Sequence, residues 1–175
     1  MLQNQRIGVF VDVQNMFYAA RNQHEGRLNY GKLLPWVVGD RQLVRAVAYL
    51  IRSPEVDQTK FMDMLRRQRF EVRVKDLRVR PDGSTKGDWD LGIAIDTLSL
   101  ADRLDVVCLV TGDGVFVDLV HMLKALGVRV EVYSFRPSTA EELVEAATAF
   151  VEIEPGMLIK GQGGIREQNS TRGDK

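Results

Sequence analysis

Cysteine and histidine are nearly absent from this chain, which has one cysteine and two histidines among its 175 residues. The single cysteine, Cys108, excludes an intramolecular disulfide and a cysteine-based zinc site. Because it lies in the apolar run 106–110, we expect a small core residue in a reducing compartment. The two histidines, His24 and His121, are expected to be helix or surface residues and not catalysts.

Long apolar runs and an excess of either charge are also missing. No segment approaches the roughly 18 consecutive apolar residues of a membrane span, and the first residues lack the layout of a signal peptide. We therefore expect a cytoplasmic protein that has no membrane partner. The 24 basic and 24 acidic residues cancel, so no global field attracts nucleic acid or lipid.

The length and composition are those of one globular domain. Hydrophobic residues make up 45% of the chain, enough for a packed core, and a domain typically contains roughly 100 to 200 residues. We assign residues 1–160 to this domain. Residues 161–175 are mostly glycine, small polar and charged residues, so we expect a flexible C-terminal tail.

Short apolar runs alternate with helix-length segments. The β-branched runs predict strands at 7–11, 43–51, 72–79, 106–110 and 128–133. The longer segments predict helices at 14–23, 30–38, 54–69, 89–104, 115–126 and 140–149. Ser53 and Pro54 resemble a helix start, and Gly127 a helix end. The alternation predicts an α/β fold of three layers, with a Rossmann-like, mostly parallel sheet of about five strands flanked by helices.

Aspartates follow two of the most apolar predicted strands. Asp12 comes directly after the strand 7–11, and Asp113 follows the strand 106–110 closely. In a parallel sheet both would lie at the same edge, where α/β folds bind their ligands. Either residue alone is most often a helix cap. Two such acids without an adjacent basic residue point more strongly to a shared site.

A third acidic group lies at the start of the predicted helix 89–104. Asp88 is expected to cap this helix, and Asp90 and Asp96 lie on neighbouring faces of it. Residues 92–95 are small or apolar, so we expect a mostly buried helix, whose inner carboxylate needs a compensating cation. An oxygen-rich site without histidine or cysteine favours Mg²⁺ or Mn²⁺. Such a metal lowers the pKa of bound water and supports phosphodiester hydrolysis.

Three motifs occur in order along the chain: a hydrophobic run with Asp12 and Asn15, the sequence Lys-Gly-Asp-Trp-Asp at 86–90, and Thr-Gly-Asp-Gly-Val-Phe at 111–116. Together they resemble the NYN domain family, and the second motif is closest to its LabA-like (DUF88) branch. The resemblance runs from Arg6 to Glu154 and implies the fold of the PIN-like superfamily.

The resemblance implies a divalent-metal-dependent ribonuclease or RNA-processing protein, an endoribonuclease that hydrolyses phosphodiester bonds with Mg²⁺ or Mn²⁺ and activated water. It carries catalysis onto Asp12, Asn15, Asp90 and Asp113, where Asn15 orients water or substrate. Asp12, Asp90, Asp96 and Asp113 are the implied metal ligands.

One position departs from the third motif. Val115 stands where the family normally has a second aspartate, so Asp88 or Asp118 would have to complete a four-carboxylate site. This departure motivates a second hypothesis, a catalytically weak NYN-domain protein that binds RNA or a nucleotide or acts as a regulatory interaction module. A phosphatase or receiver-like fold is a third class. Its motifs would require a second aspartate at the position of Gln14 or a paired lysine near the last strand, and neither is present.

Charges of opposite sign occupy adjacent segments. Residues 60–86 contain nine basic and four acidic residues, whereas residues 88–118 contain seven acidic residues and one basic residue. This segregation is typical of a phosphate-binding surface beside a metal pocket, although a solvated arginine-rich face would give the same pattern. RNA is the expected partner, self-association into a homodimer is left open, and the expected substrate contacts are Lys86, Thr111 and Tyr18. Tyr18 and Trp89 are candidates for stacking on a base.

Overall fold

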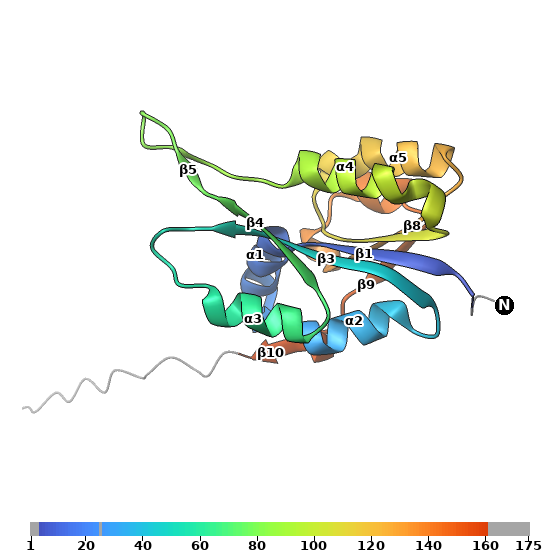
Figure 1. The fold of residues 1–175 in the computed structure, drawn as a ribbon, viewed down its shortest axis with the longest axis horizontal. Coiled ribbons are helices and arrows are strands. Elements are labelled where there is room, and N and C mark those ends of the chain that lie inside the picture. Colours follow the sequence, from blue (N-terminus) through green and yellow to red (C-terminus); the bar gives the residue numbers. More distant parts are fainter. Residues whose placement is uncertain (1–3, 25, 161–175) are drawn as a thin grey trace, which may run out of the picture.

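A six-stranded sheet forms the centre of the molecule in a computed structural model that describes residues 4–24 and 26–160 (Figure 1). The predicted tail, residues 161–175, lies outside the described residues. The strands of the sheet are β1 (Arg6–Asp12), β3 (Gln42–Arg52), β4 (Glu71–Asp76), β7 (Val106–Val110), β8 (Arg129–Ser134) and β9 (Ala149–Glu152). Their order is β4-β3-β1-β7-β8-β9, and all five neighbouring pairs are parallel.

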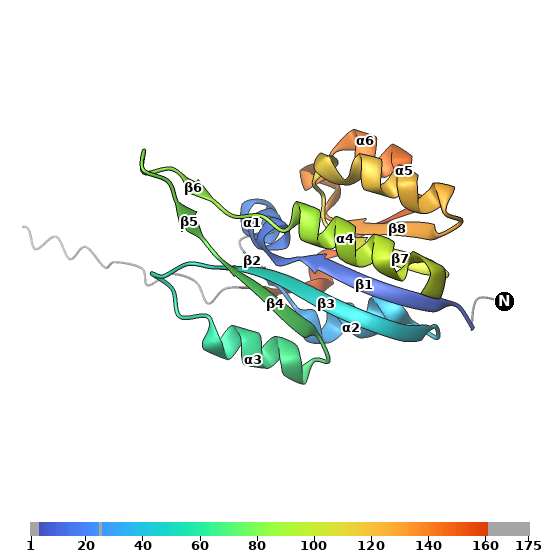
Figure 2. The same cartoon turned by 45° about the horizontal axis from the view of Figure 1, so that its top comes forward.

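Helices cover both faces of this sheet, so the predicted three-layer α/β architecture is confirmed (Figures 1 and 2). They are α1 (Val13–His24), α2 (Tyr30–Val38), α3 (Thr59–Arg67), α4 (Asp90–Leu100), α5 (Val117–Ala125) and α6 (Glu141–Ala146). The first three pack on one face and the last three on the other. Strand β1 supplies both cores, because Val9 and Val11 face one layer and Phe10 faces the other. Cys108 is a buried free thiol, as predicted.

The strand order reverses between β1 and β7. From β1 the chain winds outward through β3 to β4, and it then crosses back to β7 and continues through β8 to β9. In doubly wound sheets the crevice for a ligand opens at this reversal, beyond the carboxyl ends of the strands. Asp12 is the last residue of β1, and Asp113 follows β7 after two residues. The topology therefore puts both aspartates at the reversal.

The prediction of about five strands misses β9, and the helix predicted at 140–149 runs into its first residue, Ala149. Helix α6 already ends at Ala146, and β9 is a short edge strand whose residues are half-buried or exposed. Such a strand lacks a strong apolar run. The strand predicted at 72–79 is divided into β4 and β5 (Arg78–Val79), and the pairing of β5 with β6 (Thr85–Lys86) was missed. A second ribbon of two strands, β2 (Gly26–Leu28) with β10 (Leu158–Lys160), was also missed.

The start predicted for the third helix is wrong. Helix α3 begins at Thr59 and not at Pro54, because two side chains hold the preceding segment in turns. Ser53 Oγ accepts the N–H of Glu55 at 3.4 Å, and Asp57 Oδ1 accepts the N–H of Thr59 at 3.0 Å. At the other end of the molecule, Gly127 follows helix α5 with a φ of 84°.

Helix α4 is less buried than its apolar sequence predicts. Ile93 is buried, but Leu91 is 70% exposed and Ile95 is 56% exposed, since the helix packs on the sheet with one side only. Within the described residues, no helix is both long and apolar enough to cross a membrane.

Packing beneath α4 gives a first prediction. A Cβ on Gly92 would lie 2.4 Å from Cε3 of Trp89, whose indole N–H donates to the Leu50 carbonyl at 2.8 Å. We expect Gly92→Ala to lower the free energy of unfolding by about 1–3 kcal/mol, because the ring must move and lose this bond. Denaturant unfolding followed by tryptophan fluorescence measures the change.

The control is Gly31→Ala in α2, where the added methyl would meet only the flexible side chain of Gln68, at 3.3 Å. This variant gains the same helix propensity. If both variants unfold at the same denaturant concentration, Gly92 is not required for the packing of Trp89.

Candidate active site

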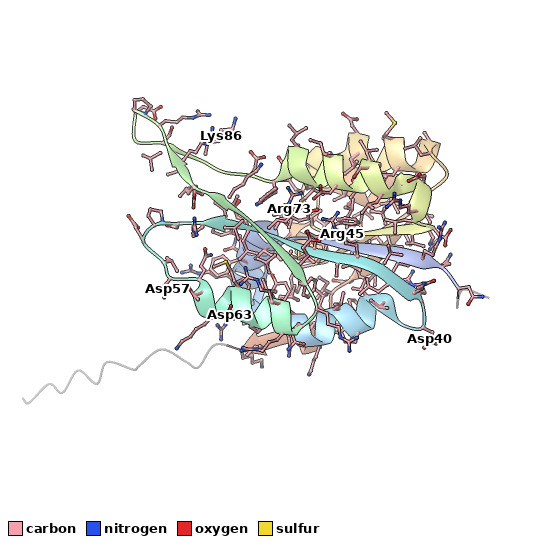
Figure 3. The ribbon with its side chains drawn as sticks, viewed as in Figure 1. Asp40, Arg45, Asp57, Asp63, Arg73 and Lys86 are labelled. Carbon is pink, nitrogen blue, oxygen red and sulfur yellow. The ribbon has the colours of Figure 1, made fainter. Side chains whose placement is uncertain are left out.

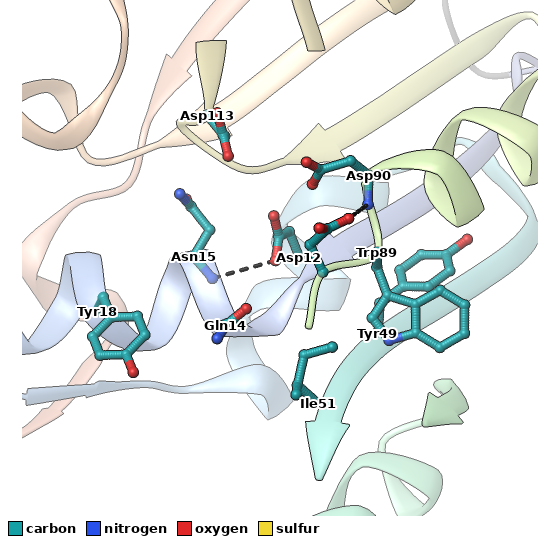
Figure 4. Close-up of a pocket in the computed structure, with 10 residues that line it drawn as sticks. Asp12, Gln14, Asn15, Tyr18, Tyr49, Ile51, Trp89, Asp90 and Asp113 are labelled. Atoms are coloured by element: carbon teal, nitrogen blue, oxygen red, sulfur yellow. Dashed lines mark hydrogen bonds between the residues drawn. The ribbon is translucent and has the colours of Figure 1, made fainter. Parts of the chain in front are cut away.

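A pocket of about 220 Å³ opens at the carboxyl edge of the sheet, where β1, β3 and β7 end (Figure 4). All three motifs contribute to it. The residues that line it are Asp12, Gln14, Asn15, Tyr18, Tyr49, Ile51, Asp88, Trp89, Asp90 and Asp113. In the described part of the chain, four of the lining residues are acidic and none is basic.

Asp12 stands at the base of this pocket with two hydrogen-bond donors. Its Oδ1 accepts the backbone N–H of Asn15 at 3.3 Å, and its Oδ2 accepts the hydroxyl of Thr111 at 3.5 Å. Burial raises the pKa of Asp12 to about 6, and the charges of Asp90 and Asp113 add to this effect, while the two hydrogen bonds oppose it. The carboxylate is therefore held where its charge is poorly stabilised by the protein alone.

The third motif is tied to the first by short polar contacts. The N–H of Gly112 donates to Oδ1 of Asn15 at 2.9 Å, and the N–H of Asp113 donates to the Thr111 hydroxyl at 3.2 Å. A side chain on Gly112 would collide with the carbonyl of Ser138, which lies 2.5 Å from the position of a Cβ. Glycine is thus required by the close approach of two backbones.

Asp113 both caps a turn and lines the pocket. Its Oδ1 accepts the N–H of Val115 at 3.0 Å at the start of a short 3-10 turn, Gly114–Phe116. The alternative that it is a helix cap is therefore correct for one oxygen.

The second motif contributes two acids from the start of α4. Asp90, the first residue of the helix, is half-buried, and its pKa is raised by burial and by the charges of Asp88 and Asp113, while Lys75 opposes the rise. Asp88 is exposed at the rim, and its Oδ1 accepts the N–H of Asp90 at 3.2 Å. The N-cap position is occupied by Trp89 and not by Asp88 as expected, and Asp88 binds the first N–H of the helix from the preceding position. Asp88 also lines the pocket.

Asp96 is not brought into the pocket. It is a buried residue of α4, where its carboxylate accepts hydrogen bonds from the hydroxyl of Tyr49 at 2.7 Å and from a guanidinium N–H of Arg73. The cation that its burial requires is thus supplied by strand β4 and not by a metal. The structure gives no support to Asp96 as a metal ligand.

The missing acid of the third motif is not replaced from α5. Asp118 is exposed on that helix and does not line the pocket. Val115 is 54% exposed and does not line it either. Of the two acids expected to substitute, only Asp88 stands at the pocket.

The expected substrate contacts occupy different places. Tyr18 is 53% exposed and lines the pocket, one helical turn beyond Asn15 (Figure 4). Thr111 is 1% exposed, so it holds the two aspartates in place and does not face a substrate. Lys86 is exposed on β6, outside the pocket lining.

Trp89 is unsuited to stacking on a base, contrary to the expectation from its sequence position. It is 7% exposed, and its ring centroid lies 5.2 Å from that of Tyr49. The Lys75 ammonium stands 4.2 Å from the ring centroid and the Arg73 guanidinium 5.0 Å from it. Trp89 therefore forms a wall of the pocket.

Sequence reasoning missed the lining residues Gln14, Tyr49 and Ile51. Tyr49 is the register partner of Asp12 in the pairing of β3 with β1, and Ile51 lies two residues further along β3. A strand that pairs in parallel with β1 must end at the same edge of the sheet, so its last residues are candidates for the pocket. The sequence does not show which predicted strand pairs with β1, so Tyr49 and Ile51 could not be identified.

The oxygen atoms that line the pocket are ligands suited to a hard divalent cation. The pocket offers carboxylate and amide oxygens, and burial together with neighbouring like charges raises the pKa values of Asp12 and Asp90. Across residues 4–24 and 26–160, however, no three acidic, histidine or cysteine side chains already lie close enough to hold an ion. The acids would have to approach one another or bind the ion partly through water.

The raised pKa of Asp12 predicts a pH-dependent cost in stability. The Asp12 carboxyl has a pKa of about 6 in the folded state and about 3.9 in the unfolded state. Its ionisation therefore lowers the free energy of unfolding as the pH rises from about 3.9 to about 6. We expect Asp12→Asn to be more stable than the unmodified protein at pH 7.5 by about 1–3 kcal/mol, and equally stable near pH 4. Denaturant unfolding at both pH values in a chelator measures this.

Asp118→Asn is the matched control, because it removes an exposed carboxylate and should leave stability unchanged at both pH values. Equal gains from the two substitutions would show that net charge is responsible and not the burial of Asp12.

Comparisons with known proteins identify the family of this fold. The protein LabA (low amplitude and bright) of Synechococcus elongatus is 29% identical over 159 residues, and the match covers 85% of this chain and 83% of LabA. A crystal structure of a Vibrio parahaemolyticus protein of unknown function is 36% identical, with a TM-score of 0.83 over 89% of this chain and 96% of that one. A model of the NYN domain matches residues 6–154. This protein belongs to the NYN domain family.

Proposed function

We propose that this protein is a divalent-metal-dependent endoribonuclease that hydrolyses phosphodiester bonds in RNA or processes RNA. The observation that carries the proposal is the convergence of Asp12, Asp90 and Asp113 in one pocket that, among the described residues, has no basic side chain in its lining. An uncompensated cluster of carboxylates is costly unless a cation is bound. Membership of a family with a PIN-like nuclease fold supports the same chemistry.

Asp12, Asp90 and Asp113 would hold Mg²⁺ or Mn²⁺, with Asp88 at the rim as the further acid. When bound, the metal would polarise a phosphoryl oxygen and lower the pKa of a water. The side-chain carbonyl of Asn15 is engaged by Gly112, which leaves its NH₂ group as the donor for water or a phosphate oxygen.

Two exposed side chains near the acids, Tyr18 and Lys86, support the proposal of an RNA substrate. The exposed ring of Tyr18 offers a face on which an unpaired base can stack, an interaction worth about 1–3 kcal/mol. Lys86 lies two residues before Asp88 and can reach a phosphate next to the pocket. Thr111 acts by positioning Asp12 and Asp113.

A second candidate function is a catalytically weak protein that binds RNA or a nucleotide or regulates a partner. The exposed Val115, at the position of a family acid, favours this alternative. The homodimer and the cytoplasmic location stay predictions from the sequence.

We expect cleavage of single-stranded RNA with Mn²⁺ or Mg²⁺, abolished by a chelator. Asp12→Asn and Asp113→Asn should each reduce the rate at least about a hundredfold, because each removes a charged metal ligand. Gel analysis of a labelled RNA measures this. Added Mn²⁺ should also raise the melting temperature of the unmodified protein more than that of Asp12→Asn.

Asp118→Asn is the control and should cleave normally, since its carboxylate is exposed outside the pocket. Cleavage that persists in both pocket variants would identify a contaminating nuclease and remove the support for this function.

The substitution Val115→Asp separates the two candidate functions. A carboxylate here adds an acid beside Asp113, whose Oδ1 already accepts the N–H of residue 115. We expect Mn²⁺-dependent cleavage to rise about tenfold. Val115→Asn, which lacks the charge, should give no such gain. If neither substitution changes a cleavage rate that is already near zero, the binding or regulatory function is favoured.

A further inference from the structure

A ribbon of two strands, β5 and β6, projects from the sheet (Figures 1 and 2). The chain leaves β4, forms the antiparallel strands β5 and β6, and returns to the start of α4. We call residues 78–86 the basic arm. They contain three basic residues, Arg78, Arg80 and Lys86, and one acidic residue, Asp82.

Two of these cations face each other directly. Arg78 and Lys86 are register partners in the antiparallel pairing of β5 with β6, so their side chains leave the ribbon on the same face. Like charges in this arrangement destabilise a ribbon, and both residues are exposed. An isolated ribbon of two strands is itself only marginally stable. The pairing is thus unfavourable for the fold alone.

The charges of the arm are not neutralised within the described residues. Asp82 is engaged by Ser84, which donates its N–H at 2.9 Å and its hydroxyl at 2.6 Å. No carboxylate of the described chain forms an ion pair with Arg78, Arg80 or Lys86.

Two arginines of strand β3 behave differently. Arg45 pairs with Glu71 at 2.8 Å, and Arg52 pairs with Asp76 at 2.7 Å. The fold therefore neutralises basic residues along β3 and leaves those of the arm available to an external anion.

The base of the arm is fixed at the rim of the pocket. A Cβ on Gly87 would lie 3.0 Å from Ile51, which lines the pocket, and 3.2 Å from Leu77. Asp88, the next residue, lines the pocket as well. Lys86 therefore lies two positions before the pocket-lining residue Asp88, about 7 Å along an extended chain.

A row of basic residues connects the arm with the pocket wall. Arg73 and Lys75, two residues apart on β4, lie on the same face of the strand, and both stand over the ring of Trp89. Figure 3 shows Arg73 on this strand and Lys86 on the arm. Lys75 also donates to the backbone carbonyl of Asp88 at 3.4 Å. A polyanion leaving the pocket along this face would meet Lys75 and then the arm.

We infer that the basic arm is a second binding site, which holds the backbone phosphates of a single-stranded RNA while the pocket acts on a neighbouring phosphodiester bond. This inference rests on the proposed function. The small pocket and the exposed ring of Tyr18 favour a single strand over a duplex, because an unpaired base is free to stack there. The site makes the protein prefer strands long enough to reach the arm.

The test measures binding of a fluorescent 12-nucleotide single-stranded RNA by anisotropy, with Mg²⁺ present. All proteins carry Asp12→Asn so that cleavage cannot interfere. We expect Arg78→Gln combined with Lys86→Gln to weaken binding about tenfold or more and to reduce the slope of log K against log salt by about 1.4, as for two lost phosphate contacts. A 3-nucleotide RNA should lose less affinity than the 12-nucleotide strand.

The matched control is Lys60→Gln combined with Arg67→Gln, which removes the same charge from exposed positions of α3 on the opposite face of the sheet. Its binding should be nearly unchanged. The arm variant should also melt at the same temperature as its parent or higher, because a repulsive pair is removed. A purely structural role for the arm predicts a lower melting temperature.

Equal losses in the arm variant and the control, or tighter binding of a 12-base-pair duplex than of the single strand, would overturn the inference. The proposed function fails separately. Arm-dependent RNA binding by a protein that cleaves no RNA with any divalent metal would exclude the ribonuclease and retain the arm.

Discussion

The molecule is organised around carboxylates that the fold brings to one pocket, whose lining contains no basic side chain among the described residues. Asp12 ends the central strand, and the reversal of strand order next to it brings Asp113 to the same edge. The bond between Asn15 and Gly112 and the two bonds of the Thr111 hydroxyl hold this arrangement. Repulsion between acids would otherwise push the loops apart, so these few contacts set the geometry of the whole edge.

The contrast with Asp96 shows that the fold neutralises acids where it needs to. Arg73 and the Tyr49 hydroxyl satisfy that buried carboxylate, which does not line the pocket. Basic side chains of strand β4 contact Trp89 and Asp96 and so stabilise one side of α4. Asp90, at the start of the same helix, lines the pocket. Of the two acids, Asp96 is paired with a cation, whereas Asp90 faces a pocket without a basic lining residue among those described.

The sequence predicted the layers, five of the six central strands and the acids at strand ends, because each depends on local patterns. Short apolar runs and the residues that follow them are visible without knowledge of the fold. The partner of Asp96 was not predictable, because Arg73 lies 23 residues earlier and meets it only after β4 has joined the sheet. The burial of Trp89 is a long-range outcome of the same kind, because its indole N–H bonds the carbonyl of Leu50.

Asp12, Asp90 and Asp113 differ in the hydrogen bonds that their carboxylates accept from the chain. Asp12 and Asp113 each accept hydrogen bonds that shape the chain, whereas the Asp90 carboxylate accepts none from the described residues. Gly112 likewise serves close backbone packing. A relative that had lost its chemistry would therefore still be under selection to keep the first and third motifs for folding. Within such a family, the acid at the position of Asp90 is the one whose loss would mark a protein that retains the fold after giving up the reaction.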